Sequence, residues 1–143
     1  MNRILSIALV LASTFAAAGT SSAQDHKVEA TVPFNFTVGD KTLPAGTYTI
    51  SNSGDAPELL ALNNWEKRVN ILTMGTPDDY NNPKQVNVLV FHKYGDQYFL
   101  SRICSEGASM NIDFSPTKAE KRARTQVEEA GRYVNDPVLI ALN

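Results

Sequence analysis

The stretch LPAGTYTI, residues 43–50, places a turn signal directly before a strand signal. Pro44 presets the φ angle of the first central position of a turn and pushes Leu43 into an extended conformation. Gly46 can adopt a positive φ angle, which would close a type I turn with a bulge. Residues 47–50 then alternate polar and apolar side chains, as a strand does. We therefore predict a hairpin corner here, with the chain returning antiparallel to the preceding strand.

Alternation with a period of two residues continues on both sides of this corner and predicts strands over most of the chain. Gly39 and Asp40 suit the centre of a two-residue turn, and a break is expected at Asn63 and Asn64. The segment from 85 to 104 is the clearest hairpin, with YGDQ at its turn. The predicted strands are 26–32, 34–38, 47–50, 58–63, 68–73, 85–92, 97–104, 110–114 and 136–143.

One helix is predicted over about residues 115–130. Ser115 can cap it, Pro116 suits its first turn, and Gly131 suits the position after its last residue. An apolar stripe of small residues follows one face: Ala119, Ala123, Val127 and Ala130. Because this stripe lacks large side chains, the helix is expected to lie on the surface of another element.

Most of the other residues of this helix are charged. Glu120 and Arg124 are four residues apart and are expected to form an ion pair along the helix. The basic residues are interleaved with acidic ones, which favours a solvated face over an anion-binding face.

About eight or nine short strands with one late helix fit an all-β antiparallel fold. The sequence leaves open whether this fold is a sandwich or a small barrel.

Residues 1–23 have the features of a secretory signal peptide. A positive charge precedes a short apolar run, and Ser21 and Ala23 occupy the small-residue positions of a signal-peptidase site. The apolar run is shorter than the ~20 residues of a membrane span. We expect cleavage after Ala23, export to the periplasm or the cell exterior, and one mature domain at 24–143 without a membrane span.

Charge and cysteine content narrow the possible partners. The formal net charge of −2 gives no sign of a nucleic-acid partner. Cys104 is the single cysteine, and exported proteins normally pair their cysteines. We favour a buried, inert thiol over an intermolecular disulfide, because free cysteine is among the most buried residue types. A catalytic thiolate would need a histidine partner, for which His92 is the candidate.

The chain contains no nucleophile elbow, phosphate-binding loop or zinc-protease motif. His92 has no partner close in sequence, so an enzyme built from Asp78, Asp79 and His92 is the least favoured hypothesis. The loop Asp78–Asn82 offers oxygen ligands that calcium accepts, but such turns are common without metal. We expect no catalytic activity, no cofactor-binding residue and no metal-binding residue.

Two blocks, VPFNFTVGDKTLPAGTYTI at 32–50 and FHKYGDQYFLSRI at 91–103, are followed by a charged helix and an apolar C-terminal strand. In this combination the chain resembles a family of small exported proteins that is abundant in acidobacterial and related soil bacteria. The resemblance covers most of the mature chain and implies export and an all-β domain. It implies no catalytic residue, and Cys104 departs from the family's pattern.

These observations support two functional hypotheses. The first is an exported, non-catalytic β domain that acts as a binding or structural module of the periplasm or cell envelope. Its partner would be a protein or a glycan, contacted by Tyr80, Tyr94 and Tyr98. The alternative is a small β-barrel that carries a small lipophilic ligand in its interior.

Overall fold

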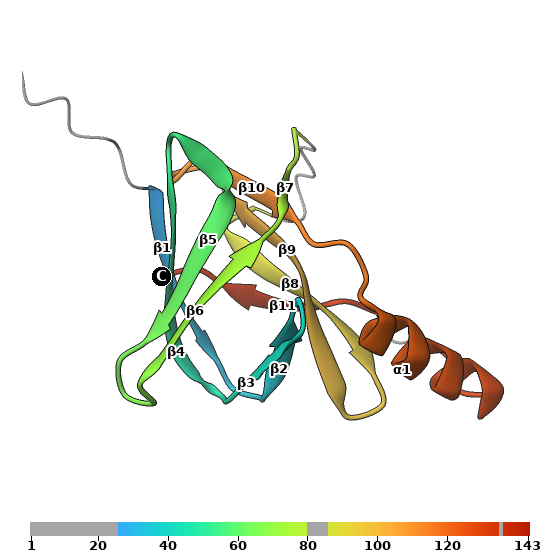
Figure 1. Cartoon of the computed structure of the whole chain (residues 1–143). Coiled ribbons are helices and arrows are strands. Elements are labelled where there is room, and N and C mark those ends of the chain that lie inside the picture. The colour runs from blue at the N-terminus through green and yellow to red at the C-terminus, as the bar shows by residue number, and fades with distance from the viewer. Residues whose placement is uncertain (1–25, 80–85, 135) are drawn as a thin grey trace, which may run out of the picture.

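The computed structural model describes residues 26–79, 86–134 and 136–143. They form eleven strands and one helix (Figure 1). The strands are β1 His26–Val32, β2 Phe36–Val38, β3 Lys41–Leu43, β4 Gly46–Ser53, β5 Ala56–Asn64, β6 Val69–Met74, β7 Thr76–Pro77, β8 Val88–Tyr94, β9 Gln97–Ser105, β10 Met110–Asp113 and β11 Val138–Ala141, and the helix is α1 Lys118–Glu129.

The strands form two sheets, one of which curls into a half-barrel (Figure 1). The first sheet has the order β1-β4-β5-β6, and all its pairs are antiparallel. The second has the order β11-β8-β9-β10-β7, and β2 joins β9 in parallel while pairing with β3. The predicted all-β fold with a C-terminal surface helix is therefore confirmed, and the fold combines features of a sandwich and a barrel.

Side chains fill the space between the sheets. The largest fully buried ones include Tyr48 and Phe91, from opposite sheets. The Phe36 ring lies edge-on to both, with ring centroids 5.2 Å from Tyr48 and 5.3 Å from Phe91. Such edge-to-face contacts add to the free energy gained by burying the rings. The inward-facing residues of the alternating strands thus build one shared core.

The corner at LPAG is not the predicted hairpin. β3 pairs with β2, whereas β4 pairs with β1 and β5, so the chain changes sheets at this point. Gly46 has φ +155°, and a side chain there would collide with the Asn64 amide. The predicted positive φ is correct, but it directs the chain into the other sheet instead of back along β3.

Tyr48 holds this corner in place. Its hydroxyl donates a 2.6 Å hydrogen bond to the carbonyl oxygen of Pro44, four residues earlier. Its ring is fully buried in the core. Burial raises the pKa of the Tyr48 hydroxyl, and the neighbouring Asn64 amide opposes this effect only in part. The tyrosine thus fastens the turn to the core with both its polar and its apolar parts.

Several strand boundaries differ from the prediction; β4, for example, extends to Ser53, and β2 begins at Phe36. Asn63 and Asn64 belong to β5 and not to a break, because the turn lies at 65–68. The Asn64 side-chain oxygen accepts the Lys67 backbone N–H at 3.0 Å, which closes that turn. The short strands β3 and β7 were not predicted, since two or three residues are too few to show alternation.

The helix starts later than predicted. Thr117, not Ser115, is the N-cap, and its hydroxyl oxygen accepts the Glu120 backbone N–H at 3.2 Å. Glu120 and Ala123 are the buried residues of the helix, whereas Ala119 of the expected apolar stripe is exposed. The expected pair of Glu120 with Arg124 is wrong, because Arg124 bonds Glu128 at 2.8 Å.

The C-terminal strand joins the two sheets. A C-terminal strand is confirmed within the predicted range 136–143, and β11 pairs antiparallel with β8. Beyond it, the backbone N–H of Asn143 donates to the carbonyl oxygen of Glu29 at 2.8 Å. The β1 end of the first sheet is therefore connected to the second sheet.

A Gly46→Ala substitution tests the corner. The added methyl group would meet Asn64 and disfavour the required φ angle, so we expect the free energy of unfolding to fall by about 2 kcal/mol. Urea denaturation measures this change. The matched control is Gly107→Ala, where an added methyl group meets nothing within 4 Å. Equal stability of the two variants would contradict the account.

A Tyr48→Phe substitution tests the hydroxyl. Loss of its bond to Pro44 should cost about 1 kcal/mol at pH 8. The wild-type free energy of unfolding should also fall as the pH rises above 10.0, because the unfolded tyrosine ionises there while the raised pKa keeps the folded one protonated. In the variant this fall should be smaller, as measured by denaturation at pH 8 and pH 11. An equal fall in the free energy of unfolding of the wild type and the variant between pH 8 and pH 11 would refute this role of Tyr48.

Candidate protein-binding surface

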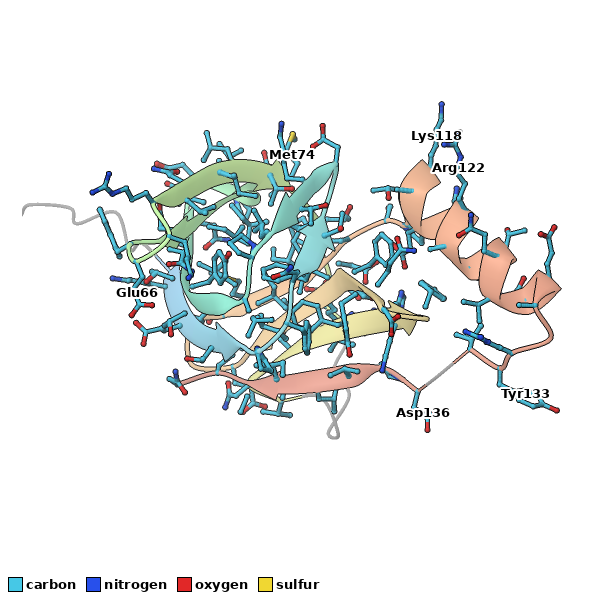
Figure 2. The ribbon with its side chains drawn as sticks, turned by 90° about the horizontal axis from the view of Figure 1, so that it is seen from below. Glu66, Met74, Lys118, Arg122, Tyr133 and Asp136 are labelled. Carbon is cyan, nitrogen blue, oxygen red and sulfur yellow. The ribbon has the colours of Figure 1, made fainter. Side chains whose placement is uncertain are left out.

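The hairpin of β5 and β6 places apolar residues on both of its faces. On the inner face, Leu60 and Leu62 are fully buried in the core. On the outer face, Leu72 and Met74 are 65% and 69% exposed. Figure 2 shows the Met74 side chain pointing away from the body of the protein. The outer face of this hairpin therefore presents apolar surface that the fold itself does not cover.

The register of the hairpin groups these outer residues. Leu59 lies opposite Met74, and Ala61 lies opposite Leu72. We call these four residues the β5–β6 patch. The turn of the hairpin adds Trp65, which is 85% exposed. Contiguous exposed apolar side chains on an otherwise polar surface mark sites of interaction with other molecules.

The patch adjoins an uncharged sheet edge. β6 is the terminal strand of its sheet, and Val69–Met74 contains no charged residue. The opposite end of the sheet differs, because β1 carries Lys27 and Glu29 and is bonded by Asn143. Natural sheets protect their edges with charges, prolines or covering segments. Charged residues and a covering segment protect β1, whereas the residues of β6 include neither a charge nor a proline.

The tyrosines expected to contact a partner do not form this surface. Tyr94 is 7% exposed, packed with Phe99 under the helix. Tyr98 is half-buried and stacks on Phe34 with ring centroids 3.8 Å apart. The hypothesis of an exposed Tyr94 is therefore wrong, Tyr98 is only partly accessible, and Tyr80 lies outside the described residues. The exposed aromatic residue beside the patch is Trp65, which the sequence signalled only by its place in a turn.

A cluster of polar side chains lies beneath the helix. His92 Nδ1 lies 2.7 Å from Glu120 Oε1, and Glu120 is 5% exposed. Burial raises the pKa of the neighbouring Tyr94 hydroxyl, and the Glu120 carboxylate raises it further. His92 thus has the tertiary partner that the sequence could not identify. Because β8 supplies the histidine and α1 the carboxylate, this contact fastens the helix to the sheet.

Cys104 is not part of this cluster. It is buried, and it pairs with Val88 on β8, four residues from His92. At the rise of a strand this separation is about 13 Å. Burial raises the pKa of the Cys104 thiol, which is the opposite of what a catalytic thiolate needs. The prediction of a buried cysteine is confirmed, and the structure does not bring Cys104 and His92 together.

The predicted acidic loop is engaged with an arginine. Arg102 Nη2 lies 3.6 Å from Asp78 Oδ2 and 3.2 Å from Asp113 Oδ1. Asn81 and Asn82 lie outside the described residues, so calcium binding by this loop stays a prediction. Within 26–79, 86–134 and 136–143, no group of three or more metal-binding side chains could hold an ion.

Two hollows are bordered by residues of both sheets. One of about 630 Å³ is bordered by His26, Ser105 and the C-terminal Asn143. Another of about 270 Å³ is bordered by Met74, Asp113 and Glu120. The second adjoins the β5–β6 patch at Met74.

Comparisons with protein-family models, curated proteins and solved structures find no match to this chain. The resemblance to a family of exported proteins therefore stays a prediction. In the part of the chain that the structure describes, no helix is both long and apolar enough to cross a membrane.

A double-mutant cycle with His92→Ala and Glu120→Ala tests the contact between helix and sheet. Each single variant should destabilise the fold, and the coupling free energy should be about 1 kcal/mol, because loss of one partner leaves the other unpaired. Chemical denaturation of the four proteins measures the coupling.

The control is the same cycle at Arg124 and Glu128, an exposed pair on the same helix. Its coupling should be close to the experimental error, because exposed pairs are screened by solvent. Equal coupling in the two cycles would contradict the assigned role of His92.

Proposed function

We propose that the mature chain is an exported, non-catalytic domain that binds another protein through β5 and β6. The β5–β6 patch carries this proposal. Leu72 and Met74 are more than half exposed, although other apolar residues of the same sheet are buried. Exposure of these side chains is unfavourable in the isolated chain, and a protein partner would remove them from water.

A protein fits this surface better than a glycan does. Glycan sites commonly use exposed aromatic faces. The exposed Trp65 lies at the turn, beyond the pair of Asn63 with Asn70, whereas the patch itself consists of aliphatic and methionine side chains. The unpaired strand edge beside it offers backbone donors and acceptors, which an extended polypeptide can satisfy. Protein binding therefore uses both the patch and the edge.

The carrier hypothesis receives less support. A lipophilic ligand would need space within the apolar interior, and that region is occupied by Tyr48, Phe36 and Phe91. The two hollows described above include polar side chains among the residues that border them. We therefore place the binding function on the outside of the first sheet.

Export is supported by the N-terminal sequence features and not by the fold. A non-catalytic role is supported by the positions of the candidate groups. His92 is used to hold the helix, Cys104 is buried with a raised pKa, and Asp78 is paired with Arg102.

Site-specific photo-crosslinking tests the proposal. A photoreactive amino acid at Leu72 should crosslink the exported protein in its host to a discrete polypeptide. The same group at Thr31, on the outer face of β1, should give little or none of this product. Gel analysis and mass spectrometry identify the product, which we expect to be lost on adding Met74→Lys. Equal crosslinking from both positions, or from neither, would contradict the proposal.

A further inference from the structure

We infer that the partner of β6 is a second copy of this chain, paired with it antiparallel about a two-fold axis at Leu72. This inference rests on the proposed function and names the partner.

The register of β5 with β6 and one hydrogen bond determine which backbone groups face the edge of the sheet. The backbone N–H of Gly75 donates to the carbonyl oxygen of Glu58 at 2.9 Å, in continuation of the β5–β6 register. In an antiparallel ladder, pairs that exchange hydrogen bonds alternate with pairs that do not. Gly75, Thr73 and Ile71 therefore direct their backbone groups toward β5.

The intervening residues face away from β5. Asn70, Leu72 and Met74 thus direct their N–H and C=O groups toward the edge where the sheet ends. Their side chains are exposed on the outer face. A strand that pairs with this edge would satisfy the backbone groups and extend the apolar surface at the same time.

β6 is complementary to itself in one register. With the two-fold axis at Leu72, the residue pairs are Leu72 with Leu72 of the second copy, and Asn70 with Met74 in both directions. All three edge-facing residues then exchange hydrogen bonds, whereas a shift of the axis to Ile71 or Thr73 leaves one of them out. The four residues of the central row nearest the axis are apolar, because Ala61 lies beside each Leu72.

Charge also permits this pairing. Val69–Met74 has no charged side chain, so two copies meet without like charges opposite each other. The antiparallel arrangement places the turn of one copy, where Lys67 and Arg68 outnumber Glu66, near the far end of the other strand. The exposed Asp79 follows that end. A short strand pair is a small interface, so we expect reversible association that is evident at about 100 µM protein.

Cysteine crosslinking tests the register in a Cys104→Ala background. Hydrogen-bonded partners on antiparallel strands have Cα atoms about 5.5 Å apart, which a disulfide can span. On mild oxidation at about 100 µM, Leu72→Cys should give a covalent dimer. Asn70→Cys alone should not, because its copies lie about 13 Å apart in this register. A mixture of Asn70→Cys and Met74→Cys should again give the dimer.

Sedimentation of the uncrosslinked protein provides the second measurement. The wild type should show a monomer–dimer equilibrium, and Leu72→Lys should weaken it at least tenfold, because two lysines would face each other on the axis. Leu59→Lys is the control on the same outer face but away from the edge, and it should change the equilibrium much less.

Three results would overturn the inference: a wild type that stays monomeric, no disulfide from Leu72→Cys, or equal disulfide formation from Asn70→Cys alone. If the photo-crosslinking experiment at Leu72 then captures a different polypeptide, the proposed function stands and only the second copy is rejected. If it captures nothing, both are rejected.

Discussion

The hydrogen bond from the Tyr48 hydroxyl to the Pro44 carbonyl oxygen holds the point at which the chain leaves one sheet and enters the other. Gly46 supplies the backbone conformation for this change of sheet, and the buried Tyr48 ring ties it to the core. Because β4 then pairs with both β1 and β5, the order of the first sheet depends on this corner. If β4 returned along β3 instead, the two sheets could not share their core.

The same strand order gives the first sheet two unequal ends. At β1 the C-terminal residue Asn143 bonds Glu29, and charged side chains protect the edge. At β6 the sheet ends in an uncharged strand whose outer face carries Leu72 and Met74. The helix does not cover this strand, because the contact between His92 and Glu120 holds it against β8. A partner protein on β6 would pair with the backbone groups of this edge and cover the exposed apolar side chains.

Local sequence signals predicted the strands well and their partners poorly. Period-two alternation and turn residues are local, so the hairpin of β8 and β9 could be predicted. Pairing of β4 with β1 depends on residues far apart in sequence. The local turn signal at the corner does not contain this information and therefore predicts a hairpin. Tyr94 was expected at the surface because a strand pattern does not show that the helix covers it. Likewise, the contact of Glu120 with His92 joins residues 28 positions apart, which a local helix pattern does not show.

Amide hydrogen exchange measured at two protein concentrations tests the central claim, an open β6 edge that closes on association, most directly. In dilute protein, the amides of Ile71 and Thr73 should be protected by β5, while those of Asn70, Leu72 and Met74 should exchange rapidly. In concentrated protein, the second set should become protected as well. Protection of Leu72 in dilute protein, or rapid exchange at both concentrations, would contradict the account.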